Sequence, residues 1–333
     1  MAIFFPKRDV HGGTGKRQRE KSKKNVVDFS ASTNPFPPEF NWDCDPAQLA
    51  YYPDDTYFEL KERIAHTFHR ASEEICVGNG SIELLRVFCS VTFKGDKKTF
   101  FTESPTFGEY ELSARLAGAY RIKNSHEADV SFLCNPNNPT GILHKKHELE
   151  HLLDRVKSHE GLLFCDEAFI ELSDPTQTMA DIRDPHLFVL HSLTKSFSIP
   201  GLRFGFGFGD PSLIDKIEIA RPPWSVNAFA EAFAMEAFMH MDELAASRAA
   251  IAQECERLSA AIDRLGLRCN PSSANFILVD CGKEVVPLCT ALLHHDILVR
   301  DCTSFGLPAC IRVAVKTPEE NQLLLEALAA CMR

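Results

Sequence analysis

Short apolar runs alternate with amphipathic helical segments from about residue 75 to residue 220, and this alternation constrains the fold more than any other feature. The apolar runs are typical of buried strands, and the segments between them have the spacing of helices with one apolar face. Strands that alternate with helices form a mostly parallel sheet covered by helices on both faces. The sequence therefore predicts a large α/β domain.

Several of the predicted strands end in polar residues. A glycine turn with Ser81 closes one strand, Asn135 begins a run of amides and prolines after another, and Asp166 closes a third. Lys195 follows the next apolar run. Ligands of open α/β sheets bind at the carboxyl ends of the strands, so these residues are expected to meet at one site. A glycine turn before a helix also predicts an anion site built from backbone N–H groups.

Lys195 lies in a stretch of small hydroxyl residues that runs to Arg203. A lysine at the end of a buried strand is costly to desolvate, and one role that accounts for it is a Schiff base formed by an amine of lowered pKa. Ser192 and Arg203 would then be a hydroxyl and a guanidinium ligand for a phosphate. The alternative is a surface lysine with a structural arginine. The other polar residues at the strand ends favour the Schiff-base site.

The chain after residue 228 has the pattern of a second, smaller α+β domain. A helix is expected over about 228–264, with a break near Met241, and strands are expected near residues 275, 297 and 310. Arg300 and Arg312 lie near strand ends, where a guanidinium suits carboxylate or phosphate recognition. The expected division is an N-terminal segment, 1–35, that contributes to the small domain and to the mouth of the site, a large domain, 36–228, and a small domain, 229–333.

The composition is that of an ordinary globular protein and excludes several classes of partner. The 333 residues are 44% hydrophobic and 25% charged, with a net charge of -10, which argues against nucleic-acid and anionic-membrane partners. No apolar run is long enough to span a membrane, and the N-terminus lacks the apolar core of a signal peptide, so a cytoplasmic protein is expected. The basic run at 16–24 is interpreted as a solvated loop, and His11 before it as a candidate ligand.

Neither the cysteines nor the histidines form a metal motif. The 12 cysteines are scattered singly, without a C-x-x-C pair, and are interpreted as reduced core residues. His144, His147 and His151 share one helical face, but the lysines and glutamate among them favour a solvated face. No metal is assigned.

These residues resemble the fold-type I pyridoxal-phosphate (PLP) enzymes of the aminotransferase class I/II superfamily, and the resemblance covers nearly the whole chain. Within it, the chain is most similar to the L-threonine-O-3-phosphate decarboxylases of cobalamin biosynthesis, with the histidinol-phosphate aminotransferases as near relatives. The motifs that carry the resemblance are His11-Gly12-Gly13, Asp28-Phe29-Ser30-Ala31 with Asn34-Pro35, Pro105-Thr106-Phe107-Gly108-Glu109-Tyr110, Asp166-Glu167-Ala168-Phe169-Ile170, Ser192-Leu193-Thr194-Lys195 with Ile199-Pro200-Gly201-Leu202-Arg203, Pro222-Pro223-Trp224-Ser225-Val226-Asn227, Ser272-Ser273-Ala274-Asn275-Phe276 and Arg300-Asp301-Cys302-Thr303-Ser304-Phe305.

The resemblance implies PLP as cofactor and a role for each matching residue. Lys195 would carry the cofactor and move protons at the substrate Cα, and Asp166 would pair with the pyridine nitrogen. That pair, at ~4 Å and an effective dielectric of about 20, is worth about 4 kcal/mol. The other implied cofactor ligands are Gly80, Ser81, Ile82, Phe107, Asn138, Ser192 and Arg203, with Tyr57 supplied by the second subunit of a homodimer. The implied substrate ligands are His11, Asn34, Asn138, Arg300 and Arg312.

Three hypotheses for the reaction remain at this point. The leading one is decarboxylation of O-phospho-L-threonine, or also of O-phospho-L-serine, and the second is a histidinol-phosphate aminotransferase. A non-catalytic interaction protein is disfavoured by the acidic charge. Phe169 stands where the aminotransferases usually carry tyrosine, which fits the decarboxylases. Ser32 and Thr33 replace the residues expected before Asn34, which leaves the choice between phosphothreonine and phosphoserine open.

Overall fold

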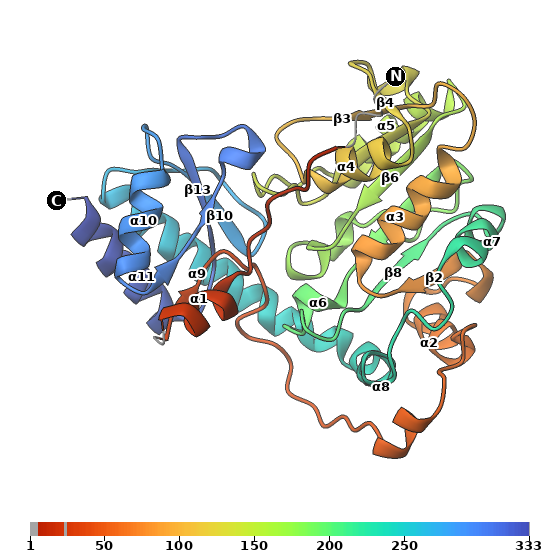
Figure 1. The fold of residues 1–333 in the computed structure, drawn as a ribbon, viewed down its shortest axis with the longest axis horizontal. Coiled ribbons are helices and arrows are strands. Elements are labelled where there is room, and N and C mark those ends of the chain that lie inside the picture. The colour runs from red at the N-terminus through yellow and green to blue at the C-terminus, as the bar shows by residue number, and fades with distance from the viewer. Residues whose placement is uncertain (1–5, 23–24, 333) are drawn as a thin grey trace.

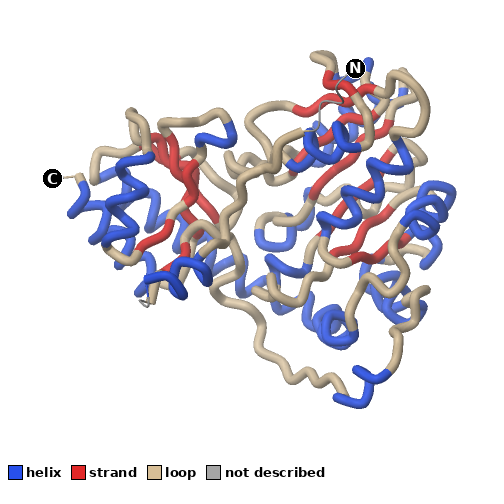
Figure 2. The backbone as a smooth tube through the Cα atoms, in the orientation of Figure 1, coloured by secondary structure: helices blue, strands red, loops and turns tan. Residues whose placement is uncertain are grey.

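The computed structural model describes residues 6–22 and 25–332, which form two lobes, and the N-terminal segment is one of the stretches of chain that run from one lobe to the other (Figure 1). That segment starts beside the large lobe, passes between the lobes and reaches α1 (Gly15–Ser22) on the small lobe. The strands fall into two groups, one in each lobe (Figure 2).

The large lobe is built on a seven-stranded sheet of order β2-β8-β7-β6-β5-β3-β4. Strands β4, β3, β5, β6 and β7 run parallel, and β8 runs antiparallel to both of its neighbours. The predicted mostly parallel sheet is thus confirmed, with one reversed strand. The strands are β2 (Ile75–Gly78), β3 (Thr99–Thr102), β4 (Tyr120–Arg121), β5 (Val130–Cys134), β6 (Leu162–Asp166), β7 (Leu187–His191) and β8 (Gly205–Phe208).

Helices cover both faces of this sheet because each has one apolar face to bury. On one face, side chains such as Leu60, Leu149 and Ala234 pack in a core that includes Val189. On the other, Leu84 and its neighbours pack against phenylalanines of the strands. The first face carries α2 (Phe58–Phe68), α5 (Lys146–Lys157) and α8 (Ala228–Ala237), and the second carries α3 (Ser81–Thr92), α4 (Glu109–Leu116) and α7 (Pro211–Ala220).

The small lobe combines a four-stranded antiparallel sheet with a parallel pair. The four-stranded sheet has the order β12-β13-β10-β9, and in the parallel pair Val27 of β1 is registered with Ile297 of β11. The elements are β1 (Val27–Asp28), α9 (Leu244–Arg264), β9 (Arg268–Cys269), β10 (Phe276–Asp280), α10 (Val286–His294), β11 (Ile297–Leu298), β12 (Arg300–Asp301), β13 (Cys310–Ala314) and α11 (Pro318–Cys331).

Two details of the small lobe bear on the sequence predictions. The long helix expected over 228–264 is broken by a 3-10 segment, Phe238–Glu243, in which His240 leaves the helical conformation, so the predicted break is confirmed. The single strand expected near residue 297 is instead two strands in different sheets, β11 and β12. Among the described residues, no helix combines the length and apolar character needed to cross a membrane.

Candidate active site

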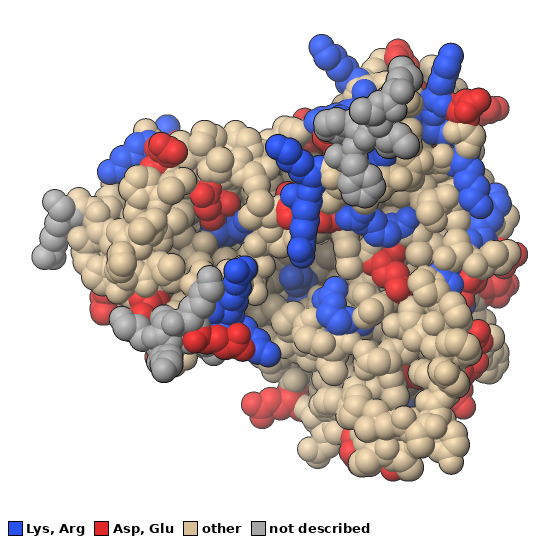
Figure 3. All heavy atoms as spheres, viewed as in Figure 1, with Lys and Arg blue, Asp and Glu red and all other residues tan. Residues whose placement is uncertain are grey.

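A cavity of about 570 Å³ lies where the two lobes and the N-terminal segment meet. Basic side chains gather around the hollow between the lobes (Figure 3). We call its inner end the floor and its outer end the mouth. The floor is formed by Ser81, Asn138, Asp166, Ser192, Lys195 and Arg203, and the mouth by Asp9, His11, Glu109 and Arg300.

The floor forms because neighbouring parallel strands end at the same level. Cys134 at the end of β5 is registered with Asp166 at the end of β6, and Asp166 with Leu190 near the end of β7. The loops that follow therefore deliver their polar side chains to one edge of the sheet. Lys195 follows on α6 (Leu193–Ser196), a single helical turn directly after β7. The predicted convergence of the strand-end residues is confirmed.

Asp166 is a buried carboxylate with a defined orientation. Its Oδ2 accepts a hydrogen bond from the Tyr110 hydroxyl at 2.6 Å, and its Oδ1 accepts one from the Ala168 backbone N–H at 3.0 Å. Burial raises the pKa of Asp166 above its ordinary value, and these two donors act in the opposite direction. A carboxylate fixed in this way is suited to pair with a cationic nitrogen above it.

Lys195 has the electrostatic environment of a nucleophilic amine. Burial, followed by the charges of Arg312 and Arg203, lowers the pKa of Lys195 from 10.5 to about 8, against the opposing effect of Asp166. The amine lies 5.7 Å from the centre of the Phe169 ring. About a tenth of the amine is therefore neutral at pH 7, far more than for an ordinary lysine, and the neutral amine is the form that attacks a carbonyl.

An anion-binding corner lies at one end of the floor, where Gly80 precedes α3. Gly80 has a φ of +79°, and a Cβ there would lie 2.4 Å from Arg203 Nη2, so only glycine lets the guanidinium approach. Gly205 on β8 has a similar role, because a Cβ there would lie 2.2 Å from the Ser81 nitrogen. The corner thus joins a guanidinium, a serine hydroxyl and the N-terminus of a 12-residue helix.

Ser192 and Thr194 add two hydroxyls to the floor, and their oxygens share a hydrogen bond at 2.8 Å. Both residues are buried and line the cavity. Thr194 was not among the predicted ligands. Ile82 and Phe107, which were, also line the cavity.

Arg312 and Asn138 are joined across the interface between the lobes. The Arg312 guanidinium donates to Asn138 Oδ1 through Nη1 and to the Ser30 carbonyl through Nη2 at 3.0 Å. Burial lowers the pKa of Arg312 to about 10. The guanidinium also lies 4.9 Å from the centre of the Phe276 ring. Its position beside Lys195 places a fixed cation over the floor.

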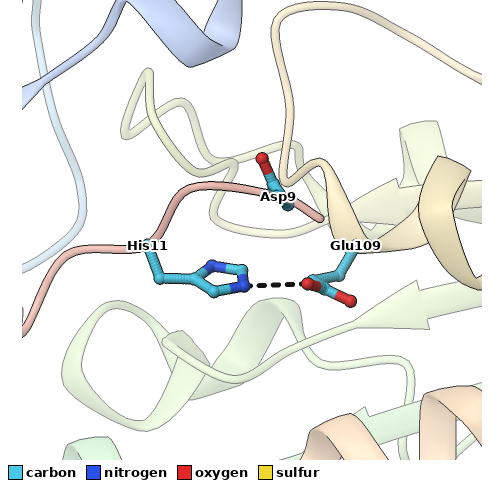
Figure 4. A group of neighbouring side chains, drawn as sticks. All are labelled: Asp9, His11 and Glu109. Carbon is cyan, nitrogen blue, oxygen red and sulfur yellow. Dashed lines mark hydrogen bonds and ion pairs between the residues drawn. The ribbon is translucent and has the colours of Figure 1, made fainter. Parts of the chain in front are cut away.

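The mouth is formed partly by the N-terminal segment. His11 points toward Glu109, and its Nε2 lies 2.8 Å from Glu109 Oε1, with Asp9 beside the pair (Figure 4). The other oxygen of Glu109 accepts a hydrogen bond from Arg86. Burial raises the pKa of Glu109, but His11 and Arg86 outweigh burial and hold it below its ordinary value. Glu109 thus joins Arg86 of the large lobe to His11 of the N-terminal segment.

Arg300 ties the small lobe to the same segment. Its Nη2 donates to the Val10 carbonyl at 2.5 Å and to Ser304 Oγ at 2.7 Å. Further along, the Gly13 backbone N–H donates to Ser30 Oγ at 2.8 Å. The segment therefore bonds to both lobes across the mouth.

Two predicted ligands lie elsewhere. Tyr57 is fully buried in the core of its own large lobe, where its hydroxyl donates to the Val226 carbonyl and accepts from the Val226 N–H, so its predicted contact with a partner's cofactor does not fit this position. Asn34 is also buried. Its amide donates to the Ser196 carbonyl and its backbone N–H to the Lys195 carbonyl, so it supports the lysine turn instead of facing substrate.

Besides Thr194, two more residues at the cavity have no role in the sequence predictions. Tyr110 and Glu109 begin α4 and contact Asp166 and His11 respectively. Both belong to the motif that runs from Pro105 to Tyr110. The sequence signal that could have indicated Tyr110 is its position on the first turn of a helix that follows a strand end.

The fold and this floor define a class of protein, namely an α/β protein with a lysine, a buried aspartate and an anion-binding corner around one cavity. The sequence comparisons agree, because the model of the family described as aminotransferase class I and II matches residues 45–130 and 120–328. The chain belongs to this family. It is a fold-type I enzyme with pyridoxal 5′-phosphate as its cofactor, as the resemblance implied.

Known relatives include both kinds of enzyme that the sequence suggested. A histidinol-phosphate aminotransferase of Symbiobacterium thermophilum is 32% identical over 337 residues, covering 95% of this chain and 93% of its own. A protein of Caldanaerobacter subterraneus subsp. tengcongensis, provisionally described as a threonine-phosphate decarboxylase, is 35% identical over 326 residues, covering 90% and 88%. The histidinol-phosphate aminotransferase of Sinorhizobium meliloti, solved with pyridoxal-5′-phosphate, superposes with a TM-score of 0.84 at 19% identity, covering 100% and 98%.

The residues of the floor fit this cofactor. The phosphate requires cationic and hydroxyl donors, which the corner at Gly80 provides with Arg203, Ser81 and Ser192. The flat ring needs an aromatic wall and a carboxylate at its nitrogen, for which Phe107 and Asp166 are available. The cavity volume lies within the range of about 300–1,000 Å³ that is usual for such ligands.

Proposed function

We propose that this enzyme decarboxylates O-phospho-L-threonine, giving (R)-1-amino-2-propanol phosphate and CO₂ in cobalamin biosynthesis, with O-phospho-L-serine as the second candidate substrate. The observation that carries the proposal is the presence of two separate cationic positions on the substrate side of the cavity. One is the buried Arg312, and the other is Arg300 at the mouth, where the ring of His11 lies on the same side of the cavity.

A phosphorylated hydroxy-amino acid has two anionic groups separated by a short carbon chain. In this proposal Arg312, which bonds to Asn138 and lies near Lys195, holds the carboxylate close to the reacting carbon. Arg300 and His11, which line the mouth, hold the phosphate further out. Binding at both ends fixes how the substrate is rotated, and this rotation decides which bond at Cα is broken.

Residue 169 supports the same conclusion. Phe169 lines the cavity near Lys195 and packs edge-on against Phe276, so no hydroxyl is offered at this position. The replacement of the usual tyrosine by Phe169 therefore lies at a position that lines the cavity near Lys195.

The residues of the floor can then divide the reaction between them. When bound, the cofactor supplies a conjugated ring that accepts the electron pair of the bond broken at Cα. Asp166 holds a proton on the ring nitrogen, and Arg312 orients the carboxylate until the bond to it breaks and CO₂ leaves. Lys195 in its protonated form then donates a proton to Cα, in the place of the lost carboxylate. A proton from solvent restores Lys195, so atoms and charge balance without a second substrate.

The second candidate is a histidinol-phosphate aminotransferase, favoured by the similarity to the Symbiobacterium thermophilum enzyme. The same mouth could hold the phosphate of histidinol phosphate. An aminotransferase requires a keto acid to complete its cycle, however, and the decarboxylase does not.

Product analysis distinguishes these candidates. The purified, cofactor-loaded protein is incubated with O-phospho-L-threonine and, separately, with O-phospho-L-serine, without a keto acid. Release of CO₂ in equal amount to a phosphoamine is expected, and the ratio of the two rates assigns the preferred substrate. Lys195→Ala is the control that must lose turnover. Inactivity with both substrates, with activity on histidinol phosphate plus 2-oxoglutarate, would establish the aminotransferase.

A homodimer is part of this proposal, as fold-type I aminotransferases are typically homodimers. Exposed aromatic side chains support it, because Tyr51 and Tyr52 are 73% and 79% exposed and Tyr52 stacks on Trp224 with ring centres 4.4 Å apart. Large exposed apolar groups of this kind are typical of an interface. Sedimentation of the purified chain as a monomer would contradict this part of the proposal.

A further inference from the structure

Tyr110 makes a contact with Asp166 that the proposed reaction does not yet use. The two residues come from different elements, Tyr110 from the first turn of α4 and Asp166 from the end of β6. Tyr110 is fully buried, with an exposed fraction of 0%, and its hydroxyl lies 2.6 Å from Asp166 Oδ2. A buried hydroxyl donating to a buried carboxylate is a strong, directed hydrogen bond.

The direction of this hydrogen bond is defined by the surroundings. Burial and the charge of Asp166 raise the pKa of Tyr110 well above 10.0, so the phenol keeps its proton and acts as the donor. On the aspartate, Oδ1 is bonded to the Ala168 N–H. An ionised carboxylate has about four acceptor positions, so two donors leave room for the N–H of a ring nitrogen.

The ring of Tyr110 is also fixed against movement. It stacks on Phe132, with centres 5.5 Å apart and planes inclined by 7°, and it meets Phe107 edge-on at 5.5 Å and 82°. Phe107 is the aromatic wall expected to face the cofactor ring. One side chain therefore contacts both groups that are expected to contact that ring.

We propose that Tyr110 is a positioning residue that acts through Asp166, keeping the carboxylate ionised and aimed so that the proton between it and the cofactor ring nitrogen stays on the nitrogen. This rests on the proposed placement of that nitrogen at Asp166. Without the hydroxyl, the carboxylate loses a donor to its charged form and becomes a better proton acceptor. The proton then moves toward Asp166, and the ring accepts electrons less readily.

The experiment compares two cofactors on the cofactor-free protein. One is pyridoxal 5′-phosphate and the other is its 1-deaza analogue, in which a C–H group replaces the ring nitrogen. Tyr110→Phe removes only the hydroxyl and is expected to weaken binding of the natural cofactor about tenfold, as for a lost hydrogen bond to a charged group, and to leave binding of the analogue unchanged. With a ¹⁵N-labelled cofactor, the ring-nitrogen resonance is expected to move toward its unprotonated position.

Tyr57→Phe is the matched control. It removes an equally buried tyrosine hydroxyl that bonds to Val226, away from the cavity. It is expected to lower the thermal stability, as Tyr110→Phe also does, without changing the ratio of the two affinities or the nitrogen resonance.

Asp166→Asn separates failure of this inference from failure of the proposed site. If Asp166→Asn distinguishes the two cofactors and Tyr110→Phe does not, the role of Tyr110 is overturned while Asp166 remains the partner of the nitrogen. Equal weakening of both cofactors by Tyr110→Phe likewise leaves only a structural role. If Asp166→Asn affects both cofactors equally, the placement of the ring nitrogen is itself wrong.

Discussion

The floor and the mouth of the cavity are built from different kinds of structure. The floor lies at the ends of adjacent parallel strands, where strand register fixes Asp166 and the loops carrying Asn138 and Lys195. The mouth depends on side-chain bonds between distant segments, such as His11 with Glu109 and Arg300 with Val10. Residues held by strand pairing keep their positions when side chains elsewhere change, so a family can keep its cofactor chemistry. Residues held only by side-chain bonds can change without altering the sheet, so substrate specificity can vary within the family.

The largest expected effect tests the floor. Gly80→Ala places a Cβ 2.4 Å from Arg203 Nη2, so the guanidinium must leave the phosphate corner. Affinity for the cofactor is expected to fall about 100-fold, equivalent to about 2.7 kcal/mol, measured by titration of the cofactor-free protein.

Gly95→Ala is the control for backbone strain. Gly95 also has a positive φ, +103°, but a Cβ there meets nothing within 4 Å. Both variants should lose about 1 kcal/mol of stability from strain, and only Gly80→Ala should lose the cofactor. Equal cofactor affinities would show that Arg203 does not bind the phosphate.

A smaller effect, on substrate binding instead of cofactor binding, is expected at the mouth. Arg300→Gln removes a cation and the bond to the Val10 carbonyl. The KM for the phosphorylated substrate is expected to rise about tenfold, with cofactor affinity unchanged. Arg268→Gln, on the exposed surface of the same lobe, is the control and should change neither quantity. A fall in cofactor affinity in Arg300→Gln would show that floor and mouth are not separable.

The smallest expected effect is a pH dependence of the floor. Because the pKa of Lys195 is about 8, its neutral fraction rises about fivefold between pH 7 and pH 8. The rate at which cofactor-free protein binds pyridoxal phosphate should rise by a similar factor and then level off.

Stability gives an independent check of the same pKa. Between about pH 8 and 10.5 the unfolded chain keeps a proton on Lys195 that the folded chain has lost, so the free energy of unfolding of the cofactor-free protein rises with pH in this window. Below about pH 8 the folded protein buries Lys195 in its charged form, and this lowers the free energy of unfolding. Lys195→Met should lack the rise, and a rise of the same size in that variant would assign it to another group.

The sequence predicted the floor better than the mouth, because the floor depends on local strand patterns and the mouth on contacts between distant segments. Apolar runs with polar ends are local patterns, and they located Asp166 and Lys195 correctly. The bond between His11 and Glu109 joins residues 98 positions apart, and no local pattern specifies it. The hydroxyl contact of Tyr110 likewise depends on how α4 is rotated against the sheet.

The two predicted ligands that lie away from the cavity, Tyr57 and Asn34, are there for related reasons. Tyr57 lies among several aromatic residues, and only packing decides which of them is buried; Tyr52 is exposed and Tyr57 is not. Asn34 follows a turn-rich segment that could have faced the cavity, but its amide bonds to the backbone of the lysine turn. The reversed strand β8 follows a loop after α6, and the regular alternation gave no sign of its direction.

The pairing of β1 with β11 has a consequence for how the protein emerges from the ribosome. Val27 can pair only after Ile297, about 270 positions later in the chain, has been synthesised. The seven strands of the large sheet, in contrast, have all been synthesised by Phe208. Domains generally fold as units during synthesis, and contacts between distant segments form late. A nascent chain can therefore have a finished floor for the cofactor while the segment bearing His11 is still unpaired, and substrate recognition is the last property that the protein acquires.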